Sequence, residues 1–232
     1  MTSKKHNVVI FAAGKGSRLN IGLPKSLANI EGQRLFELQL KQLSGTNCAV
    51  YVVCGYKANA LFGAVSEFLE SGNVQIPVVS FIYNPEYELS QVVSIKYALS
   101  AVPLNCPTIF IDGDILFNRE TIVQFFASDS TSVLVRNDIS SDAVVGDVED
   151  GRLVHFRRDG IGDCEWANIA KYAVPDLEKL FNAANESNCI HHFEIINDLV
   201  AKGVSVNVIR GHVAELDTHA DLTDMKKFIQ SM

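Results

Sequence analysis

Two cations lie at a spacing that could grip a polyphosphate. Arg18 and Lys25 follow the glycine-rich stretch Ala12-Ala13-Gly14-Lys15-Gly16-Ser17. An arginine can bond two phosphate oxygens through its planar fork, whereas a lysine supplies a mobile point charge. Pro24 stiffens the chain just before Lys25, so less entropy is lost when this side chain docks. The segment is a candidate phosphate-binding loop; considered alone, a glycine-rich turn with two solvated cations explains it equally well.

Two well-known phosphate-binding patterns do not fit this segment. A dinucleotide fingerprint needs a third glycine where the chain has Leu19, and an acidic residue after the second strand, where it has Cys54. A P-loop needs Gly-Lys-Ser or Gly-Lys-Thr, but the Lys25-Ser26 pair follows proline. The interpretation that remains is a loop of another kind, in which glycines let backbone N–H groups approach a polyphosphate.

Carboxylates stand at two other places where a metal could be held. Asp112-Gly113-Asp114 ends the apolar run 108–111, and Asp217 follows a later apolar run. The carboxyl ends of strands in α/β sheets are where ligands bind, and hard oxygen ligands suit Mg²⁺. The alternatives are an ordinary Asp-Gly-Asp turn for the first group and helix capping for the second.

The elements that must position these residues alternate along the chain. Apolar runs predict strands, and amphipathic stretches between them predict helices. Their continuous hydrophobicity indicates strands buried on both faces, which is typical of a parallel sheet covered by helices. We expect an α/β fold with three layers, a mostly parallel sheet flanked by helices, in a single domain spanning 1–232. The predicted strands are 7–12, 48–54, 76–83, 108–112, 131–136, 165–174 and 204–209, with a hairpin around 149–151; the predicted helices are 33–43, 58–70, 90–101, 176–185, 191–202 and one from about 220.

Composition excludes several classes of protein. The chain of 232 residues is 47% hydrophobic and 20% charged, without an apolar run long enough to span a membrane, so we expect a cytoplasmic protein. The net charge of -7 argues against nucleic-acid or membrane partners, which normally require a clustered basic surface. Five cysteines without a Cys-x-x-Cys spacing are expected to be reduced core thiols rather than zinc ligands.

The motifs, taken in order, resemble those of a known family. The segment 12–18, then Pro24-Lys25, then 112–114 are similar to the signature of nucleotidyltransferases with a GT-A-like sheet, including MobA-like NTP transferases. Further similarities cover nearly the whole chain: Gly55-Tyr56, Asn84-Pro85-Glu86-Tyr87, Ser94-Ile95 and Glu215-Leu216-Asp217-Thr218 with Asp221.

This resemblance implies that a phosphorylated acceptor attacks the α-phosphorus of a nucleoside triphosphate and releases pyrophosphate, with Mg²⁺ as cofactor. It implies catalytic roles for Arg18 and Lys25 on the triphosphate. An acceptor phosphate is already anionic at neutral pH, so no general base is needed. The implied nucleotide-binding residues are Ala12, Ala13, Gly14, Gly16, Ser17, Ser94 and Asp112, and the implied metal ligands are Asp114, Glu194 and Asp217.

The second half resembles bacterial CTP:phosphocholine cytidylyltransferases and their phosphonate- and polyol-phosphate-using relatives. The short connection between Arg18 and Pro24 is similar to that of CTP-using members, and Phe193-Glu194 matches their aromatic-acid pair, with Glu in place of Asp. We therefore expect CTP and a small phosphorylated acceptor as partners, and a homodimer as a further expectation. The candidate acceptor-binding residues are Glu165, Trp166, Tyr172, His191 and His192, with sheet packing or a surface position as the alternative readings.

Two other functions stay open. One is a sugar-1-phosphate nucleotidylyltransferase using UTP, dTTP or GTP, or a molybdenum-cofactor nucleotidyltransferase, which the Asn84-Pro85 segment and Ser94 also resemble. The other is a regulatory protein that binds nucleotide without turnover. The joint presence of Arg18, Lys25 and Asp114 argues against such a binder, because binding alone would not need a metal ligand and both cations.

Overall fold

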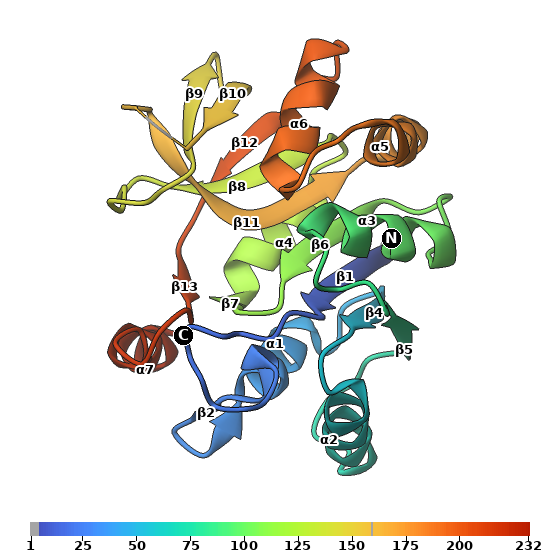
Figure 1. Ribbon diagram of the computed structural model, residues 1–232, viewed down its shortest axis with the longest axis vertical. Helices are drawn as coiled ribbons and strands as arrows, with labels where there is room; N and C mark the ends of the chain where they lie inside the picture. Colours follow the sequence, from blue (N-terminus) through green and yellow to red (C-terminus); the bar gives the residue numbers. More distant parts are fainter. Residues whose placement is uncertain (1–4, 159) are drawn as a thin grey trace.

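One large mixed sheet runs through the computed structural model, which describes residues 5–158 and 160–232. Its strands are β1 (His6–Ala12), β4 (Cys48–Cys54), β5 (Val78–Tyr83), β6 (Thr108–Asp112), β8 (Ser132–Arg136), β9 (Val145–Glu149), β10 (Arg152–Arg157), β11 (Cys164–Tyr172) and β12 (Asn207–Arg210). They lie in the order β5-β4-β1-β6-β11-β8-β12-β10-β9 (Figure 1). Both halves of the sequence therefore contribute to the same sheet.

The half of the sheet formed by β5, β4, β1 and β6 is entirely parallel. In the other half, β11 and β10 run antiparallel to their neighbours, whereas β8 and β12 are parallel to each other. The predicted α/β fold is confirmed, with a sheet that is parallel in one half and mixed in the other. Strands β4 and β5 lie on one side of β1 and β6 on the other, so the strand order reverses beside β1, and ligands bind outside the carboxyl ends of strands at such a point.

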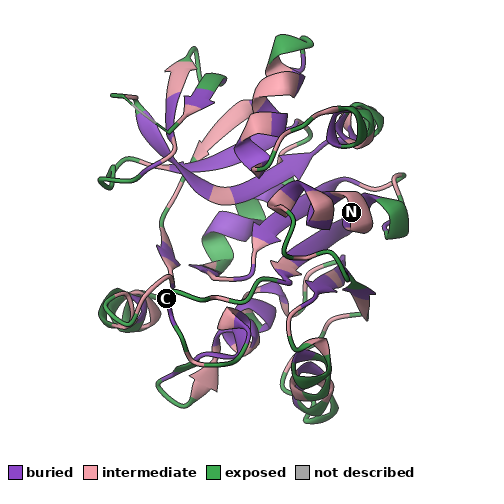
Figure 2. Ribbon diagram, in the orientation of Figure 1, coloured by how far each residue is buried: buried purple, intermediate pink, exposed green. Residues whose placement is uncertain are grey.

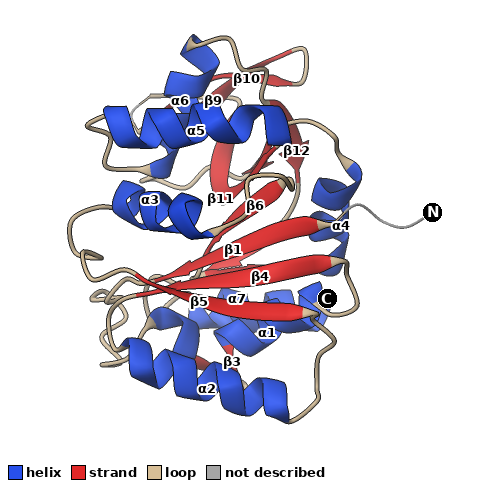
Figure 3. Cartoon of the chain, turned by 90° about the vertical axis from the view of Figure 1, so that its right-hand side faces the viewer, coloured by secondary structure: helices blue, strands red, loops and turns tan. Residues whose placement is uncertain are grey.

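Helices cover both faces of the sheet. Successive side chains of β1 point to opposite faces, so this one strand contributes to the core on each side. Val8 and Ile10 pack against α1 (Leu35–Leu43), α2 (Ala58–Glu70) and α4 (Arg119–Ala127), whereas Val9 belongs to the core beneath the opposite set of helices. That second set comprises α3 (Gln91–Ala101), α5 (Val174–Glu186) and α6 (His192–Ala201). Figure 3 shows the two sets on either side of the strands, and Figure 2 shows the buried residues concentrated along the central strands. Continuous hydrophobicity in β1 thus reflects burial on both faces.

A small additional layer brings the end of the chain back to the centre of the sheet. β7 (Ile115–Phe117) pairs antiparallel with β13 (Val213–Glu215), and α7 (Leu222–Ser231) packs against them. The backbone N–H of Leu216 donates to the carbonyl of Asp114 at 3.0 Å. Leu216 itself is fully buried in a third apolar cluster with Met225. This pairing places the acidic residues that follow β13 beside those that follow β6.

Several predicted boundaries shift for local reasons. Residues 29–34 form a hairpin of β2 (Asn29–Ile30) and β3 (Gln33–Arg34), with positive φ at Glu31 and Gly32, so α1 begins only at Leu35. The strand predicted from 76 begins at Val78, since Pro77 cannot donate to the ladder. Pro175 in the first turn of α5 starts that helix at Val174, earlier than predicted, and β11 ends before it. Among the described residues, every helix is too short or too polar to cross a lipid bilayer.

Candidate active site

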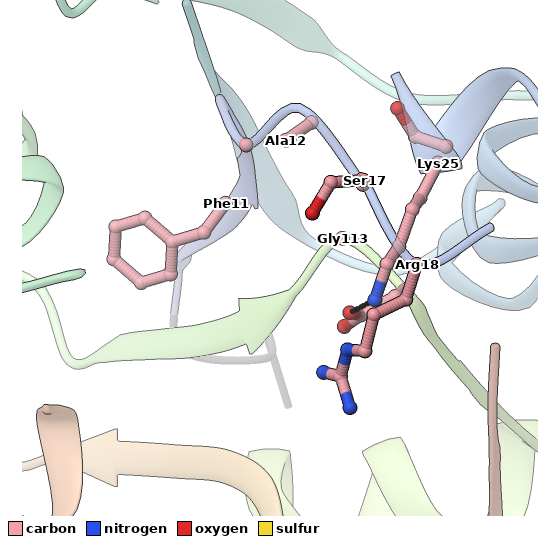
Figure 4. Close-up of a pocket in the computed structure, with 10 residues that line it drawn as sticks. Phe11, Ala12, Ser17, Arg18, Lys25 and Gly113 are labelled. Carbon is pink, nitrogen blue, oxygen red and sulfur yellow. Dashed lines mark hydrogen bonds and ion pairs between the residues drawn. The ribbon is translucent and has the colours of Figure 1, made fainter. Parts of the chain in front are cut away.

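The loop after β1 is shaped by a close approach between a glycine and a lysine. Gly16 has a φ of +60°, and a Cβ at this position would lie 2.4 Å from Cγ of Lys25. Only glycine tolerates both conditions at once. The loop is anchored by Leu19, which is 1% exposed. Lys25 opens the short 3₁₀ helix Lys25–Leu27, and Figure 4 shows its side chain extending in the same direction as that of Arg18.

A second glycine lets β6 end tightly against β1. The N–H of Gly113 donates to the carbonyl of Phe11 at 2.9 Å, and a Cβ on Gly113 would lie 2.5 Å from that same oxygen. The resulting turn places Asp114 next to the loop after β1. The two turns border a pocket of about 250 Å³ at the carboxyl ends of β1 and β6. It is called the nucleotide pocket below, because most of the predicted nucleotide-binding residues line it. The lining residues are Phe11, Ala12, Gly14, Gly16, Ser17, Arg18, Lys25, Ser26, Gly113 and Asp114.

The two cations meet two carboxylates here. Nζ of Lys25 lies 2.7 Å from Oδ2 of Asp114 and also bonds Oδ1 of Asp217. Nη2 of Arg18 lies 2.9 Å from the same Asp217 oxygen. The Lys25 side chain is 14% exposed, and burial lowers its pKa, but Asp114 and Asp217 raise the pKa more strongly. Lys25 is therefore an ammonium at neutral pH, and Arg18, whose side chain is 62% exposed, is the more accessible of the two cations.

Three carboxylates form a group suited to a divalent cation. One oxygen each from Asp114, Glu215 and Asp217 lie within 4.8 Å of one another. Burial, together with the charges of Asp114 and Asp217, raises the pKa of Glu215 to about 7. Hard oxygen donors crowded at this distance match the ligand preference of Mg²⁺. Glu215 was not among the predicted ligands, although its position two residues before Asp217 in an extended segment puts both side chains on one face.

Asp112 faces a different partner from Asp114. Nε2 of Gln91 donates to both carboxylate oxygens of Asp112, at 3.0 and 2.9 Å, and Oε1 of Gln91 accepts from the N–H of His192 at 3.0 Å. Burial raises the pKa of Asp112 well above its usual range, and Asp114 and Glu215 raise it further. Gln91 thus ties the end of β6 to the start of α6.

Three of the predicted nucleotide-binding residues lie outside the lining of the nucleotide pocket: Asp112, Ser94 and Ala13. Ser94 is 6% exposed, and its hydroxyl accepts from the Asn84 side chain at 2.9 Å, which holds the segment after β5. Ala13 is 4% exposed, and its carbonyl accepts from the N–H of Tyr56 at 2.9 Å. Ala12, Gly14, Gly16 and Ser17 line the pocket itself.

A second pocket of about 190 Å³ adjoins this site; because Glu165 and Trp166, two of the predicted acceptor-binding residues, line it, it is called the acceptor pocket below. It is lined by Arg18, Arg136, Ser140, Asp142, Ala143, Val144, Arg158, Glu165, Trp166, Asn168, Glu215 and Asp217. Glu165 is 4% exposed; it pairs with Arg136 and accepts hydrogen bonds from the N–H and the hydroxyl of Ser140, at 2.7 and 3.1 Å. Arg18, Glu215 and Asp217 connect this pocket with the carboxylate group. The two pockets thus meet at this group of carboxylates and at Arg18.

Comparison with known proteins identifies the family. The MobA-like NTP transferase domain matches residues 8–184. The chain belongs to this family. The match runs from β1 to the end of α5 and so includes the glycine-rich loop, both cations and Asp114. No curated protein sequence matches the chain.

Solved structures share the fold of this MobA-like NTP transferase across its length. The inositol-1-phosphate CTP transferase of T. maritima superposes with a TM-score of 0.78 and 18% identity, covering 97% of this chain and 94% of the other. The CTP:phosphocholine cytidylyltransferase of Streptococcus pneumoniae gives 0.74 and 17%, covering 97% and 99%. A UDP-glucose pyrophosphorylase complexed with UDP-glucose gives 0.78 and 13%, covering 97% and 98%. At these identities the likeness establishes the nucleotidyltransferase fold.

In this MobA-like NTP transferase, two predicted acceptor-binding residues lie in the core instead. Tyr172 and His192 are 1% and 2% exposed, and neither lines either pocket. Burial lowers the pKa of His192 to about 3 and raises the pKa of Tyr172, so the phenol and a neutral imidazole share a hydrogen bond, with 2.6 Å between Nε2 and the phenol oxygen. The two polar groups satisfy each other between β11 and α6. Trp166 lines the acceptor pocket but is only 5% exposed. Its ring packs against those of Phe156 and His192, with ring centres 5.3 and 5.7 Å apart.

Glu194, the predicted third metal ligand, is engaged elsewhere. Its carboxylate accepts from the backbone N–H groups of Ile190 and His191 at 2.7 and 2.8 Å, which forms a capping box at the start of α6. Burial would raise its pKa, but these two hydrogen bonds lower it overall. Among the described residues, the carboxylates gathered for a metal are those of Asp114, Glu215 and Asp217. The structure thus puts Glu215 in the group where the sequence suggested Glu194.

Proposed function

We propose that this nucleotidyltransferase is a Mg²⁺-dependent cytidylyltransferase. It would transfer CMP from CTP to a small phosphorylated or phosphonate acceptor and release pyrophosphate. The observation that carries this proposal is the meeting of Lys25 and Arg18 with Asp114 and Asp217 at the carboxyl ends of β1 and β6. Cations for a triphosphate and carboxylates for a metal are brought together there from opposite ends of the chain.

The residues present fit a magnesium ion. Asp114, Glu215 and Asp217 would hold it, and their burial beside one another makes a compensating cation favourable. A bound Mg²⁺ supplies charge neutralisation at the phosphate oxygens around the reacting phosphorus.

The remaining work is positioning and charge stabilisation by the chain itself. Lys25 is fixed by burial and by its two carboxylates, so its ammonium is already placed at the junction of the pockets. Arg18 is exposed enough to turn its fork toward the β- and γ-phosphates. Pre-placed charges of this kind lower the barrier because they need no reorganisation during the reaction. The acceptor is already an anion at neutral pH, so its attack needs no general base.

Two observations support CTP and a small acceptor. The chain from Arg18 to Pro24 is short, which leaves little room for the longer loop typical of sugar-1-phosphate enzymes. Two of the similar structures are, by name, enzymes that use CTP with inositol 1-phosphate or phosphocholine. The similar UDP-glucose pyrophosphorylase keeps transfer to a sugar phosphate as the second candidate.

Pyrophosphate release tests the proposal. The protein is incubated with Mg²⁺, each of the four NTPs, and acceptors that include phosphocholine, 2-aminoethylphosphonate, a polyol phosphate and several sugar 1-phosphates. Release with CTP and a non-sugar acceptor, abolished by EDTA and restored by Mg²⁺, is the expected result. Release only with UTP, GTP or dTTP and a sugar phosphate would keep nucleotidyl transfer and overturn the choice of CTP. Binding of NTP without release in any combination would favour a regulatory binder.

A further inference from the structure

We infer that Arg158 binds the phosphate or phosphonate group of the acceptor. This inference rests on the proposed function and adds a residue to it that the motifs did not indicate. The argument starts from the three guanidinium groups that line the acceptor pocket, those of Arg18, Arg136 and Arg158.

Two of these three arginines already have carboxylate partners. Arg136 forms an ion pair with Glu165, which is 4% exposed and is held by Ser140 as well. Arg18 pairs with Asp217 at 2.9 Å. An acceptor anion that approached either cation would have to compete with a carboxylate fixed beside it. These two arginines therefore contribute little uncompensated positive charge to the pocket.

Arg158 differs in its partners. Nη2 lies 3.1 and 3.3 Å from the ring nitrogens of His191, and Cζ lies 5.7 Å from the centre of the Phe193 ring. The pKa of His191 is lowered by burial and then by the charge of Arg158 itself, so this partner is a neutral acceptor. Within 5–158 and 160–232, no carboxylate lies within ion-pairing distance of Arg158; Glu194 feels its charge, but that carboxylate is bonded to backbone N–H groups.

The surroundings of Arg158 suit it to bind a tetrahedral anion. His191 and Phe193 are stacked, with ring centres 5.6 Å apart and planes 12° apart, and they form an aromatic support for the guanidinium. An arginine held on such a support retains N–H groups in a fixed fork, which match two oxygens of a phosphate or phosphonate. Less side-chain entropy is then lost on binding.

The charges of the other residues in the pocket explain why Arg158 would help to bind the acceptor. The acceptor pocket also contains Glu215 and Asp217, whose negative charges would repel an incoming phosphate. Arg158, a cation of the same pocket without a carboxylate partner among the described residues, offsets this repulsion and favours binding of the acceptor anion there.

Substitution of Arg158 by Gln tests the inference kinetically. A hydrogen bond to a charged group contributes about 1.5–3 kcal/mol, so Arg158→Gln should raise the KM for the acceptor by roughly 10- to 150-fold. The KM for CTP and the melting temperature should stay unchanged, and Arg158→Lys should restore part of the acceptor affinity. Arg152→Gln removes an equally exposed positive charge from β10 and is the matched control. An unchanged acceptor KM in an active Arg158→Gln enzyme would overturn the inference.

Chemical modification gives a readout that does not depend on turnover. The intact protein is treated with phenylglyoxal, and modified arginines are mapped by mass spectrometry with and without inorganic phosphate or methylphosphonate. Protection of Arg158 by both probes, with Arg152 unprotected, is expected; protection by only one identifies which of the two acceptor chemistries the site prefers. Protection without turnover for any NTP would sink the proposed function and leave the anion site intact. Equal modification of Arg158 with and without both probes would contradict the inference, whatever the activity.

Discussion

The polar residues on the two sides of β6 are used in different ways. On the β1 side, Lys25, Asp114 and Asp217 lie in segments that follow strands, are partly exposed, and form ion pairs with one another. On the β11 side, Tyr172 and His192 are buried and bond each other. Polar residues thus form a candidate site in one region and part of the core in the other.

The difference depends on whether a residue follows the end of a strand or lies within one. Residues after the carboxyl end of a parallel strand leave the sheet and keep access to solvent, so their charges can serve a ligand. Residues within β11 have the sheet on both sides and helices above, so every polar group must find a partner inside the protein. Lys171 illustrates the rule: it is 1% exposed and donates to backbone carbonyls at the end of α4.

Of the substitutions that test this comparison, Lys25→Ala is expected to have the largest effect on activity. Removing a pre-placed charge from a phosphoryl-transfer site should lower kcat by about 10²- to 10³-fold. Nucleotidyl transfer is measured by pyrophosphate release, and far-UV circular dichroism checks the fold. Lys41→Ala removes an exposed lysine of α1 and should leave kcat unchanged. A kcat within a factor of three of wild type would contradict the role of Lys25.

Glu215→Gln tests whether the carboxylate group is the metal site. Loss of one of three oxygen ligands should lower activity at least tenfold and raise the Mg²⁺ concentration that gives half-maximal activity, because the neutral amide is a weaker ligand. The measurement is a Mg²⁺ titration of the initial rate at saturating substrates. Asp138→Asn, a charge removal on the loop bordering the same region, serves as the control. An unchanged Mg²⁺ dependence would remove Glu215 from the site.

Burial of neutral His192 predicts a loss of stability in acid. Its pKa is about 3 in the folded protein and about 6.5 when unfolded, so the unfolded state binds more protons below pH 6.5. The contribution is complete above pH 6.5 and declines as the pH falls toward 3, by about 2 kcal/mol at pH 5. Urea unfolding at pH 7 and pH 5 measures the loss in wild type and in His192→Gln. An equal loss in both proteins would show that His192 does not titrate as its burial requires.

The sequence could predict what depends on local pattern. Continuous apolar runs such as 48–54 gave strands buried on both faces, and the glycine-rich loop with Arg18 and Lys25 gave one side of the site. The pairing of β7 with β13 could not be read this way, because it joins segments almost one hundred residues apart. That pairing alone brings Glu215 and Asp217 to Asp114. The bond between Tyr172 and His192 likewise exists only once α6 has packed on β11.

Glu194→Ala should produce the smallest effect, and it distinguishes a cap from a ligand. Loss of the capping box should reduce the free energy of unfolding by about 0.5–1 kcal/mol, since two backbone N–H groups at the start of α6 lose their acceptor. The Mg²⁺ dependence of the rate should not change. Urea unfolding and the Mg²⁺ titration used for Glu215 measure both quantities on the same samples. If Glu194→Ala shifted the Mg²⁺ dependence while Glu215→Gln did not, the family pattern would locate the metal better than this arrangement of carboxylates does. The opposite result would mean that the third metal ligand is Glu215 at the end of β13 and not the acidic residue on α6. It would also explain why the residue after Phe193 can be a glutamate whose carboxylate binds backbone N–H groups.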